Sequence, residues 1–239
     1  MDKNSNTYIF IYAVLMVVIV AAVLSFIATK LKPFQDFNEE VQKKQDILKA
    51  IQVDTNAETA LDLYDKYIVD SRVVNSEGKL LEGQNAFKTD LKKEISKPVP
   101  DRSLPIFVSA IDDGSTKLII PLQGKGLWGP IWGYISLNDD MKTIYGASFD
   151  HKSETPGLGA EINTEKFQAQ FLGKKILNDD QEFVSVKVVK GGAEEDNPYA
   201  VDAISGGTIT SNGLEDMMYD CLEPYMNYFK QELTQGGGE

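Results

Sequence analysis

The sequence contains few of the residues from which metal sites and disulfides are built. Its 239 residues include one cysteine, Cys221, and one histidine, His151. A lone cysteine excludes a disulfide within the chain and a cysteine-based metal site, and one histidine cannot form a metal cluster by itself. We therefore expect no metal site. Cys221 lies on the apolar stripe of a C-terminal helix pattern and is interpreted as core, and His151 as a structural or surface residue.

Basic residues are also in the minority. There are 24 Lys and Arg against 36 Asp and Glu, which gives a net charge of −12 at pH 7. Proteins that bind nucleic acid usually present a basic stripe, so we expect no nucleic-acid partner. The string Gly-x-Gly-x-x-Gly occurs once, at 124–129, but it lies between two strand patterns, whereas the fingerprint that cradles a dinucleotide follows a strand and opens a helix. Dinucleotide chemistry is therefore not expected in this polypeptide itself.

A long uncharged run is present near the start of the chain. Residues 8–28 include no charged side chain, and a helix of this length covers about 31 Å, the thickness of a bilayer core. We predict a retained transmembrane helix at 8–28, after a short tail at 1–7. A cleaved signal peptide is the alternative, but its apolar region would be shorter. Lysines are more frequent after the run than before it, so local charge alone predicts a cytoplasmic domain.

The rest of the chain predicts an α+β fold. Residues 33–97 read as a juxtamembrane, mainly helical segment, residues 98–235 as a domain, and residues 236–239 as a flexible tail. Four closely spaced strand patterns predict an antiparallel sheet, and they lie at 105–110, 117–122, 131–137 and 143–149. Helical patterns flank these strands. The expected architecture is a single N-terminal transmembrane helix followed by an antiparallel-sheet domain with flanking helices.

The most informative stretch is 202–211, which reads Asp-Ala-Ile-Ser-Gly-Gly-Thr-Ile-Thr-Ser. A strand-like run precedes it and an amphipathic helix pattern follows, with Ser211 or Asn212 as the expected N-cap. Two glycines and several hydroxyls therefore lie just ahead of a helix N-terminus. Free backbone N–H groups and the helix dipole favour a phosphate at such a place. An ordinary Gly-Gly turn before a capped helix is the alternative.

This stretch resembles the flavinylation motif of the FMN-binding domain family, Asp-x-x-(Ser/Thr)-Gly-Ala-Thr. The resemblance implies that a flavin transferase outside the cytoplasm esterifies Thr208 with the phosphate of FMN. The recognition frame is then formed by Asp202, Ser205, Gly206 and Gly207. Gly207 stands where the family usually has alanine, a small change that leaves the acceptor hydroxyl in place.

Two further strings resemble signatures of the same family. They are Gly-Leu-Trp-Gly at 126–129 and Glu-Thr-Pro-Gly-Leu-Gly at 154–159. Taken singly, the first is equally typical of a sheet-packing aromatic and the second of a plain turn. Together they imply that the 154–159 loop lies over the isoalloxazine, with Leu158 as an apolar contact. The FMN contacts implied in this way are Trp128, Glu154, Thr155, Gly157, Leu158, Gly159 and Thr210.

Within that family, the anchor, the string at 42–50 and Gly-Leu-Trp-Gly are most similar to the branch of C subunits of sodium-translocating NADH:quinone oxidoreductases. The resemblance implies an electron-transfer protein that relays electrons towards quinone in a complex that exports sodium. It also implies a bacterial cytoplasmic (inner) membrane, a domain facing the periplasm, and other subunits, especially B, D and E, as partners. The topology conflicts with the local charge count. One alternative is the homologous G subunit of the Rnf complex, and another is a membrane-tethered phosphate-binding module without electron transfer.

Overall fold

The computed structural model describes residues 5–236 and divides the chain into two compact units, the first ending at Lys43 and the second beginning at Lys44. Of the two tails expected from the sequence, residues 1–4 and 237–239 lie outside the described part. Each unit is described by itself.

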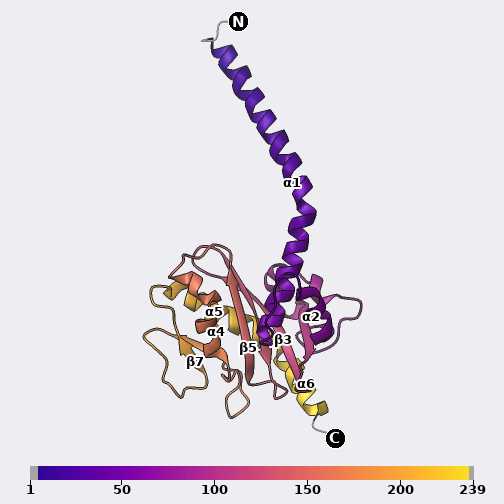
Figure 1. Ribbon diagram of the computed structural model, residues 1–239. Helices are drawn as coiled ribbons and strands as arrows, with labels where there is room; N and C mark the ends of the chain where they lie inside the picture. Colours follow the sequence, from indigo (N-terminus) through magenta and orange to yellow (C-terminus); the bar gives the residue numbers. More distant parts are fainter. Residues whose placement is uncertain (1–4, 237–239) are drawn as a thin grey trace. The chain divides into compact units, whose positions relative to one another are not determined.

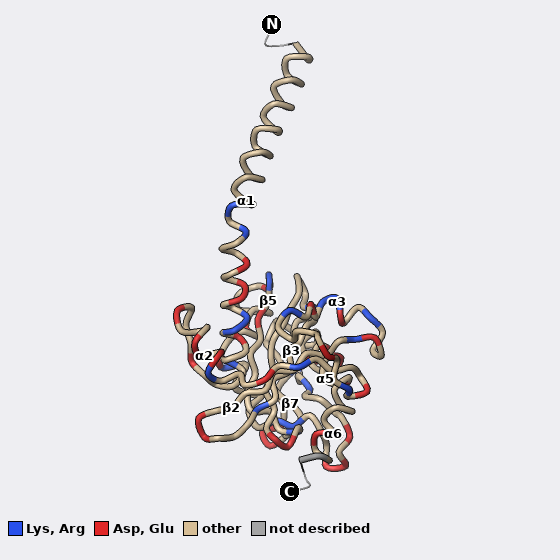
Figure 2. Tube along the Cα trace, turned by 90° about the vertical axis from the view of Figure 1, so that its right-hand side faces the viewer, with Lys and Arg blue, Asp and Glu red and all other residues tan. Residues whose placement is uncertain are grey.

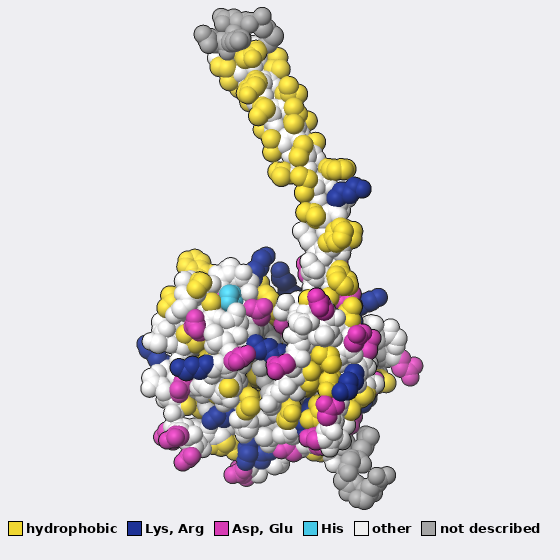
Figure 3. Space-filling view, in the orientation of Figure 1, with side chains coloured by type: hydrophobic (Ala, Val, Ile, Leu, Met, Phe, Trp, Pro, Cys, Tyr) yellow, Lys and Arg dark blue, Asp and Glu magenta, His cyan; other side chains and the backbone are white. Residues whose placement is uncertain are grey.

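The first unit consists of most of one long helix, α1 (Asn6–Ala50), which includes the whole uncharged run. Within residues 5–236 it is the one helix long and apolar enough to cross a membrane, by length and composition. Its first part carries no charged residue (Figure 2), and apolar side chains cover the face seen in Figure 3. The helix continues through Pro33, where the sequence suggested a boundary.

The second unit is built on a five-stranded antiparallel sheet with strand order β1-β2-β3-β4-β5. Four of these strands confirm the predicted ones, and they are β2 (Leu104–Ala110), β3 (Thr116–Lys125), β4 (Pro130–Leu137) and β5 (Ile144–His151). The fifth, β1 (Ile68–Val74), pairs with β2 at the edge of the sheet. It lies in the segment that the sequence assigned to the juxtamembrane region. The predicted fold class, α+β with an antiparallel sheet and flanking helices, is confirmed.

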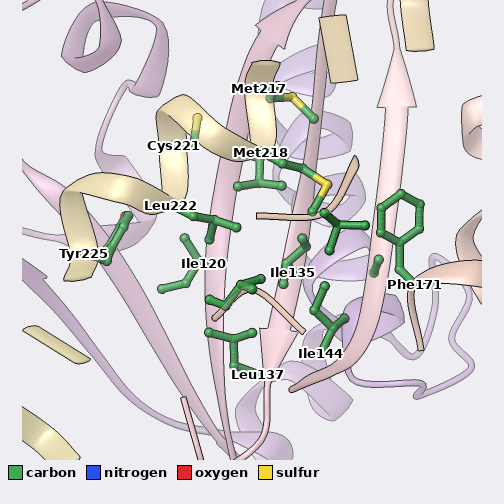
Figure 4. Close-up of a cluster of buried hydrophobic side chains, with 14 of the residues drawn as sticks. Ile120, Ile135, Leu137, Ile144, Phe171, Met217, Met218, Cys221, Leu222 and Tyr225 are labelled. Atoms are coloured by element: carbon green, nitrogen blue, oxygen red, sulfur yellow. The ribbon is translucent and has the colours of Figure 1, made fainter. Parts of the chain in front are cut away.

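Each face of the sheet carries its own apolar core, because alternate side chains of a strand point to opposite faces. On one face, α5 (Thr208–Leu222) and the short helix η5 (Glu223–Tyr225) cover β3, β4 and β5. Figure 4 shows this layer, and the labelled side chains are Ile120, Ile135, Leu137, Ile144, Phe171, Met217, Met218, Cys221, Leu222 and Tyr225. On the other face, Ile47 and Leu48 at the end of α1 pack with Phe107 and Ile119. Helix α2 (Ala60–Tyr67) lies on this second side (Figure 1).

Shorter elements connect these layers. Between β1 and β2 lie η1 (Ala86–Lys88), α3 (Leu91–Ile95) and η2 (Val99–Asp101). After β5 come η3 (Gly159–Asn163), α4 (Glu165–Gln168) and η4 (Ala169–Phe171). Two short parallel strands, β6 (Lys187–Val189) and β7 (Ala200–Asp202), lead into α5. The described chain ends in α6 (Met226–Gly236).

Candidate functional site

Helix α5 begins at Thr208, four or five residues earlier than the sequence predicted. Gly207 is its N-cap and has no side chain to cap the helix, and the N–H of Ser211 donates to the Gly207 carbonyl at 2.9 Å. The predicted caps, Ser211 and Asn212, were therefore wrong, because both lie inside the first turns. The first N–H groups of a helix have no acceptor within it. The start of α5 thus presents donors and the positive end of the helix dipole beside the half-buried Thr208.

Ser211 has a different role from the one predicted. Its side chain is fully buried, and its hydroxyl accepts the N–H of Ile204 at 3.1 Å. Gly206 has φ +76°, a left-handed conformation that favours glycine. The chain therefore turns sharply into α5, and the buried hydrogen bond between Ser211 and Ile204 stabilises that turn. Asp202 lies ahead of the turn, where its carboxylate accepts the N–H of Ala193 at 2.8 Å.

The loop at 154–159 packs against this turn. A Cβ atom on Gly206 would lie 2.6 Å from Cδ2 of Leu158, and one on Gly207 would lie 3.2 Å from the backbone nitrogen of Gly159. The two glycines thus allow the loop to approach the backbone closely. Leu158 is 41% exposed at this contact. The structure therefore brings the string at 154–159 and the stretch at 202–211 together, although nearly fifty residues separate Leu158 from Gly206 in the sequence.

Glu154 joins all three strings. Its side chain is only 5% exposed. Its Oε1 accepts the backbone N–H of Trp128 at 2.8 Å, and its Oε2 accepts the hydroxyl of Thr210 at 2.6 Å. Glycine surrounds the carboxylate, because a Cβ atom on Gly126 or on Gly159 would come within 2.6 Å or 2.5 Å of its oxygens. Sequence reasoning named Glu154 and Thr210 as FMN contacts and missed the bond between them.

The loop between β3 and β4 is a tight turn with two exposed apolar side chains. The N–H of Gly126 donates to the carbonyl of Gly129 at 2.8 Å, and the hydroxyl of Ser153 donates to the carbonyl of Trp128 at 3.3 Å. Trp128 is 67% exposed and Leu127 is 45% exposed. Trp128 is therefore not the sheet-packing aromatic that its string alone would also have allowed.

Other residues of the 154–159 loop mainly shape the loop itself. The carbonyl of Thr155 accepts the N–H groups of Leu158 and Ala160 at 3.1 Å and 3.2 Å. Gly157 has φ +75°, and its N–H donates to Oε1 of Glu161 at 3.0 Å. The main-chain carbonyl of Thr155 and the N–H of Gly157 are thus already engaged within the loop. Leu158 is the large apolar side chain that this loop exposes next to the Gly206 turn.

His151 and Cys221 both have structural surroundings. Nδ1 of His151 accepts the N–H of Glu154 at 3.2 Å, which fixes the start of the loop. Cys221 is buried, and burial raises the pKa of its thiol to about 11. Within residues 5–236, no group of three or more His, Cys, Asp or Glu side chains is arranged to hold a metal ion.

The candidate site is a surface formed by three loops. Two hollows of about 490 Å³ each are present, one beside β1 and α6 and the other between α3, β3 and α5, where Gly129 of the β3–β4 loop is part of the lining. Neither is lined by Thr208 or by residues 154–159. The chemistry of the site therefore depends on a hydroxyl at a helix N-terminus with exposed apolar side chains near it.

Comparison with known proteins points to the same part of the chain. Residues 126–223 match the FMN-binding domain family. The chain is 32% identical, over 81% of each sequence, to the C subunit of the Na(+)-translocating NADH-quinone reductase of Vibrio alginolyticus. It is 28% identical, over 96% of each, to the protein of the same name from Haemophilus ducreyi. The crystal structure of the corresponding protein from Parabacteroides distasonis is 44% identical, with a TM-score of 0.77 and coverage of 83% of this chain and 96% of that one.

Proposed function

Because the chain belongs to the family of C subunits of the Na(+)-translocating NADH-quinone reductase, we propose that it is an electron carrier with FMN linked covalently to Thr208. One observation carries the proposal. The only threonine that the flavinylation motif offers as acceptor is the first residue of α5, at an N-terminus without a side-chain cap and next to the 154–159 loop. A phosphate and a flat apolar ring need these two features side by side.

The residues present fit this cofactor. The first-turn N–H groups of α5 and its dipole stabilise a phosphate on Thr208. Glycine has no side chain, so residues 206 and 207 leave the backbone uncovered beside the proposed attachment point. Gly206 is exposed there, which leaves room for the cofactor. Leu158 and Trp128 supply apolar surface for the ring. FMN, when bound, supplies the one- and two-electron redox chemistry that the chain's own side chains do not have.

The attachment is a transfer of a phosphoryl group to a hydroxyl. A bond forms between Oγ of Thr208 and the phosphorus of a flavin nucleotide activated as a phosphoric anhydride. The anhydride bond breaks, its other phosphate departs as the leaving group, and the proton of the threonine hydroxyl is released. The chain thereby gains one FMN minus one water. The flavin transferase supplies the activated nucleotide and the catalysis, and Thr208 supplies the acceptor oxygen.

The carrier works in a membrane complex. We propose that α1 anchors it in a bacterial inner membrane, and that the second unit faces the periplasm, where the flavin transferase acts. The B, D and E subunits are the proposed electron-transfer partners, in a complex that reduces quinone and exports sodium. NADH is handled by other subunits in this proposal, because the Gly-x-Gly-x-x-Gly string of this chain, at 124–129, connects β3 to β4 and does not open a helix as a dinucleotide fingerprint does. Quinone is likewise assigned to other subunits. The names of the relatives favour this complex over the Rnf complex.

Intact mass tests the proposal. The full chain is expressed in membranes together with a flavin transferase, and its mass should rise by one FMN minus one water. Thr208→Val should abolish this gain, since valine keeps the shape of threonine but has no oxygen, and Thr208→Ser should retain it. Flavin on a proteolytic peptide that lacks Thr208 would refute the assignment. A chain without any flavin would instead support a phosphate-binding module.

A further inference from the structure

Glu154 is placed differently from the other residues that the sequence assigned to the flavin. Leu158 and Trp128 are exposed around the attachment point, whereas Glu154 is almost completely buried. Both of its carboxylate oxygens have donors inside the protein, one from the main chain of Trp128 and one from the side chain of Thr210. A carboxylate engaged in this way is a structural support beneath the site.

The geometry of α5 explains what this support does. Successive residues of a helix are rotated by about 100°, so Thr210 and Thr208 point in nearly opposite directions from the first turn. Thr210 is 1% exposed and points inward, whereas Thr208 is half-buried at the surface. The bond from Thr210 to Glu154 therefore holds the inner side of the same turn whose outer side presents the acceptor hydroxyl.

The first turn of α5 has no side-chain N-cap that could take over the role of the hydrogen bond between Glu154 and Thr210. The N-cap position is occupied by Gly207, which has no side chain that could bond to the first turn. The polar side chains that hold this start come from inside the fold: Ser211, which bonds to Ile204, and Glu154, which bonds to Thr210. Of the two, Glu154 alone comes from another loop. It therefore couples the position of the flavin-bearing turn to the 154–159 loop and to the β3–β4 turn.

We propose that Glu154 is a positioning residue for flavin attachment: it fixes the first turn of α5 through Thr210, and thereby presents the hydroxyl of Thr208 to the flavin transferase. This inference rests on the proposed function, in which Thr208 is the acceptor. It assigns Glu154 a role beneath the flavin rather than in contact with the ring.

The test measures the initial rate of flavin attachment to the full-length chain in membranes, at limiting flavin transferase. Glu154→Ala should slow attachment about tenfold, the effect of losing a charge-assisted hydrogen bond that orients a reacting group. Glu154→Gln should recover most of the rate. Its amide oxygen can accept the N–H of Trp128, and its NH₂ group can donate to the hydroxyl of Thr210, so both connections survive. This rescue separates positioning from a need for negative charge.

Glu161 provides the matched control. It is a carboxylate of the same region that accepts a backbone N–H, that of Gly157, and no bond from it to α5 is present in the described part of the chain. Glu161→Ala should therefore leave the attachment rate within about twofold of the parent, because only a local loop contact of modest strength is lost. Equal slowing by Glu161→Ala and Glu154→Ala would overturn the proposal.

A second pair of variants applies if Glu154→Ala does not fold. Thr210→Val removes the donor and keeps the volume, and Thr210→Ser restores the hydroxyl. The valine variant should attach flavin several-fold more slowly than the serine variant, since one buried hydrogen bond is lost. Attachment to Thr210→Val at the parent's rate would refute the positioning role whatever Glu154→Ala does. Failure of the proposed function has another signature, because the parent itself would then carry no flavin on Thr208.

Discussion

Replacement of Leu158 by alanine tests whether the 154–159 loop lies over the flavin. Leu158 is 41% exposed, so the change removes less buried surface than in a core, where Leu→Ala costs about 2–5 kcal/mol. In a chain without flavin, carrying Thr208→Val, we expect a loss of about 1 kcal/mol in the free energy of unfolding. If the ring covers the remaining surface of Leu158, the flavinylated chain should lose about 1 kcal/mol more.

The same substitution should move the redox potential of the flavin. A smaller side chain lets water reach the ring, and water stabilises a charged reduced form relative to a neutral one. The potential should therefore rise, and a differential stabilisation of about 1 kcal/mol corresponds to about 20 mV for two electrons. Covalent attachment should persist, because the acceptor oxygen of Thr208 is unchanged.

Chemical denaturation of the flavinylated and flavin-free chains, together with a redox titration, measures both effects. Leu233 is the control, since it is 40% exposed and lies in α6 rather than in the site. Leu233→Ala should cost the same with and without flavin and should leave the potential unchanged. If Leu158→Ala behaves like Leu233→Ala in both assays, the 154–159 loop does not lie on the flavin ring and its assignment as a flavin contact is wrong.

Three further predictions concern the topology, the core and the buried thiol. A phosphatase fused after Glu239 should be active and a fluorescent reporter at the same place dark if the second unit is periplasmic, and the reverse pattern would favour the local charge count. Ile47→Ala should destabilise the second unit by about 2–5 kcal/mol, because Ile47 is fully buried against the sheet; the exposed Lys49→Ala is the control in the same denaturation experiment, and equal effects would contradict the assignment of α1 to this core. The pKa of Cys221 is raised from 9.0 to about 11, so the folded state holds the thiol proton more tightly and the associated stability, complete below pH 9, is lost as the pH rises towards 11; the fall in unfolding free energy over this window should be smaller in Cys221→Ala, and an identical fall in both chains would show that the thiol does not contribute.

The sequence alone was sufficient for the elements whose signals are local. The uncharged run at 8–28 predicts its own helix, because length and hydropathy do not depend on the rest of the fold. The strands β2 to β5 are apolar runs separated by turn residues, and each was found close to its predicted bounds. The candidate acceptor Thr208 was also found from a local string, since the motif combines glycine and hydroxyl residues in a fixed order.

Elements that depend on distant partners were found only in part or were misplaced, and of β1 the sequence indicated only residues 71–74, as the arm before a turn at 75–78. Strand β1 has an exposed, charged middle with Asp70 and Arg72, and it is a strand because β2 offers it an edge to pair with. The start of α5 was placed four or five residues too late, because Ser211 and Asn212 are good N-caps by composition. The hydroxyl of Ser211 instead bonds to Ile204, and the buried position that allows this is not visible in a local pattern.

The composition of the site was therefore readable from the sequence, and its organisation was decided by the tertiary structure. The three strings could be recognised one at a time, together with Thr208 as the proposed acceptor. Only the folded chain places the carboxylate of Glu154 between the N–H of Trp128 and the hydroxyl of Thr210, 26 and 56 residues away. The physical reason is that a buried carboxylate must accept hydrogen bonds, and only the folded chain brings donors from distant parts of the sequence to it. Here the sheet brings a turn, a loop and a helix start to one place, and one side chain connects all three.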